Sequence, residues 1–140
     1  MISVALAQQL KQDGLQWIPA KNDFFAIPDR GLDDVIFVLS DMTVILARVH
    51  GQPAVTFHGS VEWALDHILI AEVVWLPTES QLRRELERRL AGASQPLLSL
   101  TSTRDGYRCQ IQLNRQTLAF ESFGAAETYG LALHHVLTSR

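Results

Sequence analysis

Apolar residues recur every three or four positions in four stretches of the chain, which is the spacing of one helical face. These stretches cover residues 3–13, 60–69, 79–91 and 125–137. The third is the clearest, because Thr78-Glu79-Ser80-Gln81 has a capping-box pattern and Gly92 follows the last apolar position. The pattern therefore predicts four helices, with inward faces formed by Leu6, Ala7 and Leu10; by Val61, Ala64, Leu65, Ile68 and Leu69; by Leu82, Leu86 and Leu90; and by Tyr129, Ala132, Leu133, Val136 and Leu137.

Short runs rich in β-branched and aromatic residues lie between these helices and predict strands. The runs at 35–39 and 44–49 are apolar on consecutive positions and are separated by a short polar segment. We expect these two runs to form a hairpin of central strands with both faces covered. Residues 107–113 instead alternate between apolar and polar side chains, which is typical of a strand with one wet face. The remaining predicted strands are 24–27, 55–58, 97–103 and 117–121.

A weak internal similarity organises these elements into two units. VEWALDHIL at 61–69 aligns with YGLALHHVL at 129–137 with four identities, and three strands precede each segment. Chance similarity between two amphipathic helices is the alternative explanation. The sequence predicts an α+β fold with mainly antiparallel sheet. It contains two tandem α-β-β-β-α-like units, 1–72 and 73–140, which an internal duplication would explain and which we expect to pack as one compact domain.

Composition and charge indicate which broad class of protein this chain belongs to. The 140 residues are 47% hydrophobic and carry a formal net charge of −3, so we expect a folded chain without a strongly basic surface. The start, MISVALAQQLKQDG, lacks the basic n-region of a signal peptide, and no apolar run is long enough to span a membrane. The single cysteine, Cys109, cannot form an intramolecular disulfide. We expect a soluble, cytoplasmic protein.

Candidate catalytic and metal-binding residues do not form a recognised motif. His134 and His135 are consecutive on a predicted helix and diverge by about 100°. There is no Cys-x-x-Cys pair, nucleophile elbow or phosphate-binding loop, and Cys109 falls on an inward strand face. The sequence therefore predicts no catalytic, cofactor-binding or metal-binding residue, with an enzyme of unrecognised type kept as the third hypothesis. The same holds for the candidate carboxylates and the other histidines, which are Glu62, Asp66, Asp29, Asp33, Asp34, Asp41, His50 and His58.

A candidate partner surface comes from two helical faces. Trp63, His67 and Ile70 form a second stripe beside the apolar face of the helix predicted at 60–69. Arg84 and Arg88 lie one turn apart on the helix predicted at 79–91, where neighbouring glutamates predict a neutralised solvent face. These five residues are the predicted contact surface for a partner, which we expect to be a protein.

Several segments resemble known families. IFVLSDMTV (36–44), EWALD (62–66), WLPTESQLRREL (75–86) and YGLAL (129–133) resemble a family of small, uncharacterised bacterial proteins, some of which are labelled pilus-assembly proteins. The second half is similar to short phage-encoded proteins, and its strand-Asp-Gly-Tyr-strand-strand-helix end is similar to HicB-like antitoxins.

Two main hypotheses for function follow from the sequence. The first is a non-catalytic protein-interaction or adaptor module, for which the resemblance implies a phage or mobile-element origin. The alternative is a nucleic-acid-binding or antitoxin-like module, since the α-β-β-β-α order of the second half also matches double-stranded-RNA-binding modules. Glu127 stands where those modules carry lysines at the start of the last helix.

Overall fold

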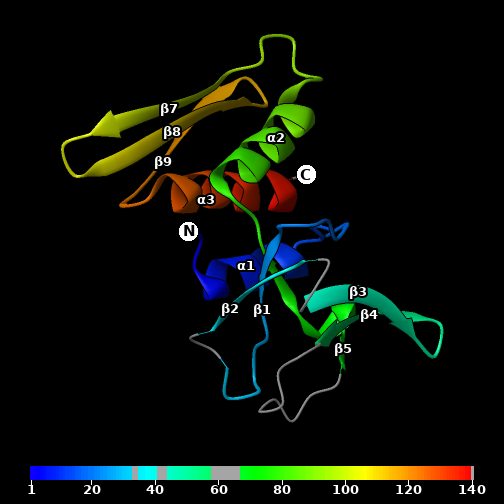
Figure 1. Cartoon of the computed structure of the whole chain (residues 1–140). Helices are drawn as coiled ribbons and strands as arrows, with labels where there is room; N and C mark the ends of the chain where they lie inside the picture. Colours follow the sequence, from blue (N-terminus) through cyan, green and yellow to red (C-terminus); the bar gives the residue numbers. More distant parts are fainter. Residues whose placement is uncertain (33–34, 41–43, 58–66, 140) are drawn as a thin grey trace. The chain divides into compact units, whose positions relative to one another are not determined.

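The computed structural model of the chain describes residues 1–32, 35–40, 44–57 and 67–139. Within these residues, three α-helices and nine strands in three antiparallel sheets confirm the predicted α+β class. The chain divides into two compact units (Figure 1). Unit 1 comprises Met1–Leu15 and Pro77–Arg140, and unit 2 comprises Gln16–Leu76. The first helix therefore clusters with the C-terminal part of the chain, whereas the predicted boundary at 72/73 grouped it with the first half. The packing of both units as one domain stays a prediction.

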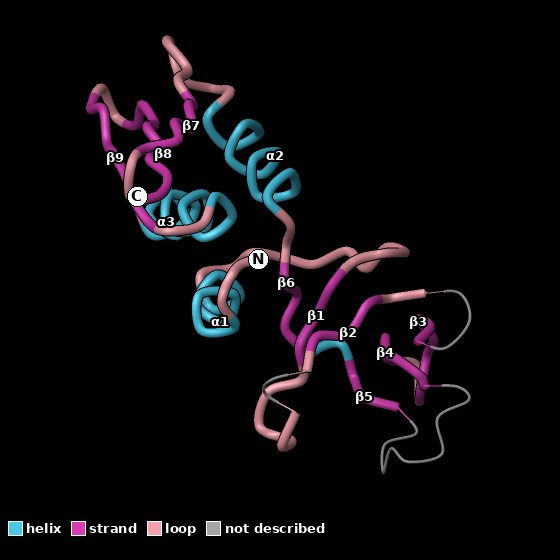
Figure 2. Tube along the Cα trace, turned by 60° about the vertical axis from the view of Figure 1, so that its left-hand side comes forward, coloured by secondary structure: helices cyan, strands magenta, loops and turns pink. Residues whose placement is uncertain are grey.

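Unit 1 contains a three-stranded meander and its three helices. β7 (Leu98–Thr103), β8 (Gly106–Leu113) and β9 (Gln116–Ser122) are hydrogen-bonded in that order. α3 (Ala125–Thr138) lies against β8 and β9, and α2 (Glu79–Leu90) packs on α3 (Figures 1 and 2). Five of the predicted inward residues are fully buried in this core, namely Leu82, Leu86, Cys109, Ile111 and Leu133, whereas Val136 and Leu137 are only partly buried.

The start of α2 follows directly from its local sequence. The hydroxyl of Thr78 accepts a hydrogen bond from the backbone N–H of Gln81, and the side chain of Gln81 accepts one from the backbone N–H of Thr78. This is the predicted capping box, and it satisfies amides that the first helical turn leaves without an intrahelical partner.

α1 (Val4–Gln12) runs parallel to α3 and is attached at both ends. Near its start, the backbone N–H and the hydroxyl of Ser3 donate to the carboxylate of Glu127 at 2.8 and 2.9 Å. Just after its end, Asp13 Oδ2 lies 2.5 Å from His134 Nδ1. Gly130 lies between these contacts, and a Cβ on it would be 2.8 Å from Leu6 Cδ2. The absence of a side chain at Gly130 therefore permits the close approach of the two helices.

Unit 2 is formed by two small sheets around one apolar core. The first sheet has the order β2-β1-β6 and the second the order β3-β4-β5. The core includes Phe25 and Phe37 from the first sheet and Val55 and Ile68 from the second. The strands are β1 (Phe24–Ala26), β2 (Ile36–Val38), β3 (Val44–Val49), β4 (Gln52–Phe57), β5 (His67–Leu69) and β6 (Val74–Leu76), with a 3-10 turn, η1 (Ile70–Glu72), before β6.

Aromatic stacking holds the two ends of unit 2 together. Trp17 and Trp75 stack with centroids 6.5 Å apart and rings 7° from parallel. Trp17 also contacts Phe25, with centroids 5.8 Å apart, and its Nε1 donates to Asp23 Oδ2 at 2.9 Å. Asp23 is buried, and the same oxygen accepts from the backbone N–H of Ala20. The entry and exit segments of unit 2 are thus fixed to each other and to its first strand.

The predicted hairpin of 35–39 with 44–49 is wrong. β2 pairs with β1, and β3 pairs with β4 through a two-residue turn at His50-Gly51 in which both residues have positive φ, 51° and 78°. β2 and β3 are therefore edge strands of different sheets, and the outward side chains of β2 are exposed. Continuous apolar runs suggested central strands, but local sequence does not determine which strands pair.

The helix predicted at 60–69 is also corrected where the structure describes it. Residues 58–66 lie outside the described residues, and His67–Leu69 form β5, which pairs with β4. The aligned segment, 135–137, is helical instead. The internal duplication is therefore not confirmed. The predicted stripe of Trp63, His67 and Ile70 is also corrected. His67 lies in β5 and Ile70 follows the end of that strand, so these two residues do not share a face of an α-helix.

We expect Gly130→Val to lower the free energy of unfolding by about 1–3 kcal/mol, because overpacking of a filled contact has this magnitude. The added side chain would collide with Leu6 and Ile2 and push α1 away from α3. Gly92→Val is the matched control, since a Cβ there meets no atom within 4 Å. Urea unfolding followed by circular dichroism measures both variants, and equal losses would contradict close α1–α3 packing.

We expect Trp17→Phe to destabilise the protein more than Trp75→Phe, by about 1–3 kcal/mol, the cost of removing a hydrogen-bond partner from a buried group. Both changes keep an aromatic ring in the stack. Only the first removes a donor from the buried Asp23, since the buried Nε1 of Trp75 has no partner among the described residues. Denaturant unfolding by circular dichroism compares the two, and an equal loss would mean that the hydrogen bond contributes nothing measurable.

Candidate functional site

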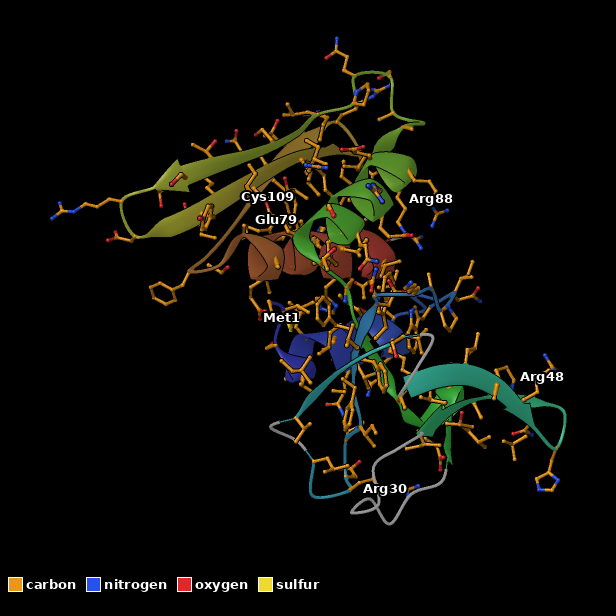
Figure 3. The ribbon with its side chains drawn as sticks, viewed as in Figure 1. Met1, Arg30, Arg48, Glu79, Arg88 and Cys109 are labelled. Carbon is orange, nitrogen blue, oxygen red and sulfur yellow. The ribbon has the colours of Figure 1, made fainter. Side chains whose placement is uncertain are left out.

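The arginines of α2 form a largely neutralised surface. Arg88 Nη2 lies 2.7 Å from Glu85 Oε2, Arg89 Nε lies 3.6 Å from the same oxygen, and Arg83 Nε lies 3.4 Å from Glu87 Oε1. These pairs confirm the expected solvated, self-neutralised face. Figure 3 shows Arg88 on the side of α2 that faces away from the sheet. Arg84 is exposed and has no ion-pair partner among the residues described.

The residues predicted as a partner surface lie in different parts of the chain. Arg84 and Arg88 belong to α2 of unit 1, and His67 and Ile70 belong to unit 2. Ile70 is half-buried against the apolar core of unit 2, so its side chain is engaged within that unit. Trp63 lies outside the described residues. That these five residues form one contact surface stays a prediction.

The histidines do not converge on a metal site in the part of the chain that is described. His134 bonds to Asp13, whereas the ring of His135 packs on Phe120 with centroids 5.5 Å apart, so the two side chains diverge as expected. His50 occupies the β3–β4 turn. No cluster of three or more His, Cys, Asp or Glu side chains able to hold a metal ion occurs among the described residues. Of the other candidates, Asp29 is exposed in the segment between β1 and β2. The remaining ones lie outside the described residues, namely His58, Glu62, Asp66, Asp33, Asp34 and Asp41.

The thiol of Cys109 lies in the interior of unit 1. The side chain points inward from β8 and has no exposed surface (Figure 3). Burial raises the pKa of the Cys109 thiol to about 11, because desolvation disfavours the thiolate. The inward strand face predicted for this residue is confirmed, and the thiol has the character of a packing group.

The outer face of the meander is polar and its groups pair locally. Arg108 and Glu121 form an ion pair at 3.7 Å across β8 and β9, and the hydroxyl of Thr117 donates to Gln112 Oε1 at 2.8 Å. This is the predicted wet face. These four side chains therefore already have partners of their own.

At the β7 edge of the meander, backbone groups have no partner strand among the described residues. The order β7-β8-β9 leaves one side of β7 without a neighbouring strand among the described residues. The N–H of Gln112 donates to the carbonyl of Leu97 at 3.2 Å, which makes 97/112 a hydrogen-bonded pair. Since such pairs alternate along an antiparallel ladder, the backbone groups of Leu98, Leu100 and Ser102 point away from β8.

Nothing in the composition of β7 protects this edge. Leu98–Thr103 reads LSLTST, with no charged residue and no proline. The other outer strands of comparable length carry a charge, Arg48 in β3 and Glu121 in β9. Charges and prolines on edge strands are the usual devices that prevent pairing with another chain. β7 is therefore the described edge best suited to accept a further strand.

The sequence predicts a strand at the β7 run but does not indicate that this strand lies at the edge of its sheet. Strand order depends on tertiary pairing, although the uncharged LSLTST composition was a visible signal. Exposed apolar side chains give a weaker candidate surface, because they are scattered over both units as Met1, Leu97 and Phe123 in unit 1 and Ile18, Ile36, Val38 and Leu46 in unit 2. Leu97, 39% exposed, is the one that directly precedes β7.

Comparisons with protein-family models, with curated proteins and with solved structures find no match for this chain. Across the described residues, none of the helices has the length and apolar character needed to span a membrane. The candidate site is therefore defined by its own geometry, as a β-sheet edge able to pair with an extended chain.

We expect iodoacetamide to alkylate Cys109 at least about 100-fold more slowly in the native protein than in the chain unfolded by guanidinium chloride. A pKa of about 11 in place of the ordinary value of 9.0 lowers the thiolate fraction near neutral pH about 100-fold, and burial slows access further. Mass spectrometry over time gives both rates. Equal rates would place the thiol at the surface.

Proposed function

We propose that the protein is a non-catalytic interaction module that binds an extended segment of a partner protein along the β7 edge. The observation that carries this proposal is the combination of outward backbone groups at Leu98, Leu100 and Ser102 with the absence of any charge in β7. Strand addition is an established mode of peptide recognition, in which main-chain hydrogen bonds give affinity and alternate side chains give specificity.

The chemistry of the edge favours an extended partner. Backbone N–H and C=O groups that alternate along a strand are complemented by the backbone of another strand. Leu98 and Leu100 are half-buried on the inward side, so an added strand would cover their remaining apolar surface. Ser99 and Thr101 lie on the polar outer side and would face polar side chains of the partner. A segment with alternating apolar and polar residues fits both sides.

The described contacts weigh against the nucleic-acid alternative. Three of the α2 arginines are paired with glutamates, which reduces the positive charge available to phosphates. At the start of α3, where double-stranded-RNA-binding modules carry lysines, Glu127 is hydrogen-bonded to Ser3, the N-cap of α1. An acidic side chain that is already hydrogen-bonded at the start of α3 disfavours the binding of a polyanion there. We therefore prefer the protein-interaction hypothesis to the nucleic-acid one.

A photo-crosslinking residue placed at Thr101 tests the proposal. Thr101 is exposed on β7, and the matched position is Ala119, exposed on the opposite edge strand β9. We expect illumination in cells to produce a heteromeric adduct from the Thr101 position and little or none from Ala119. Mass spectrometry identifies the captured segment, which is then synthesised as a peptide. This peptide should bind the purified protein and reduce the yield of the crosslinked adduct.

The variant Ser102→Pro tests whether the partner pairs with the backbone of β7 or only lies near it. It removes an N–H that points out of the sheet and leaves the β7–β8 ladder intact, so the fold should persist. We expect peptide affinity to fall at least about 10-fold, the effect of about 1.4 kcal/mol. Ala119→Pro makes the same change on β9 and should leave affinity unchanged. Equal effects of the two prolines, an adduct formed only with another copy of this chain, or turnover of a substrate would each contradict the proposal.

A further inference from the structure

An open depression of about 570 Å³ lies elsewhere in unit 1, at the end of α2. Its wall is formed by the last turn of α2, the following loop and the two-residue turn between β8 and β9. The volume falls in the range of small-molecule sites, about 300–1,000 Å³. The polar side chains that line it are Arg89, Ser94, Gln95, Gln112, Asn114 and Arg115.

The charge of this wall is of one sign. Both ionisable residues in the lining are arginines, and none of the described carboxylates lines the depression. Arg115 has no ion-pair partner within the described part of the chain. Arg89 is 3.6 Å from Glu85, which is already held more closely by Arg88 at 2.7 Å. The guanidinium of Arg115 is therefore unpaired among the described residues, and that of Arg89 uses only its Nε on a long contact with Glu85, which leaves its Nη N–H groups able to face an anion.

The backbone conformation at Arg115 is a second observation that bears on a binding role for this residue. Leu113 and Gln116 pair across a turn of Asn114 and Arg115, whose φ angles are 51° and 65°. Such turns require positive φ at both central residues, and Asn-Gly is the preferred sequence. Asparagine suits the first position, but arginine at the second is strained where glycine is not. Strained backbone positions cluster at ligand-binding sites, which agrees with a binding role for Arg115.

We propose that this depression binds the phosphate group of a small organic phosphate through Arg89 and Arg115. The planar guanidinium matches phosphate oxygens with two parallel hydrogen bonds, so two arginines recognise a phosphate far better than a carbonyl or a hydroxyl. The amides of Gln95, Gln112 and Asn114 and the hydroxyl of Ser94 supply hydrogen bonds for the rest of the molecule. The site is separate from the outer edge of β7 and does not depend on the proposed function.

Titration calorimetry with inorganic pyrophosphate and with ATP as probes tests this site in the full chain. We expect both to bind the unmodified protein and Arg115→Gly to weaken their binding at least about 10-fold, the loss of a charged hydrogen-bond donor. The same substitution relieves the strained turn, so its denaturation midpoint should rise. A fall in affinity together with a rise in stability cannot come from misfolding.

Arg104→Gln is the matched control, because it removes the same charge from the exposed turn at the opposite end of β8. It should bind both probes as the unmodified protein does. Equal weakening in the two variants, or no binding of either probe, would overturn the site. Binding of a single-stranded oligonucleotide with no binding of pyrophosphate or ATP would assign the arginines to nucleic acid and would overturn the small-molecule proposal.

Discussion

The stack of Trp17 on Trp75 is the contact on which the organisation of the chain depends. The polypeptide leaves unit 1 after Leu15 and returns at Pro77, so unit 2 is an insertion whose two ends must stay close together. The two indoles lie next to these crossings, and each is followed by an apolar residue and a proline. Two parallel rings bury a large apolar area and resist separation, which fixes the ends of the insertion without a covalent link.

With the ends of unit 2 held, unit 1 is completed by two distant parts of the chain. α1 contributes Leu6 and Leu10 to an interior otherwise made by α2, α3 and the meander. Its place is specified by hydrogen bonds at both ends and by the missing side chain at Gly130. Polar contacts at the ends set the register and apolar contacts between them supply most of the free energy, since the latter exclude water from the interface.

The local sequence is sufficient to predict the helices and strands of unit 1. It is not sufficient to predict which elements pack or pair with one another. The capping box at Thr78 and the alternation around Cys109 depend on neighbouring residues, and both were predicted correctly. The pairing of β2 with β1, the strand at His67–Leu69 and the docking of α1 on α3 depend on contacts between distant residues. For the same reason the sequence alone does not predict the β7 edge or the arginine-lined depression, because both depend on which elements lie next to one another in the fold.

The attachment of α1 to α3 has a consequence for synthesis of the protein on the ribosome. Ser3 and Glu127 are 124 positions apart, and translation at about 5–20 residues per second separates their appearance by about 6 to 25 s. Unit 2 is contiguous and emerges complete within that interval, whereas the apolar face of α1 has no native surface to cover it until α3 follows. A nascent chain of this protein therefore exposes Leu6 and Leu10 during that interval, when cellular chaperones can bind the apolar face of α1.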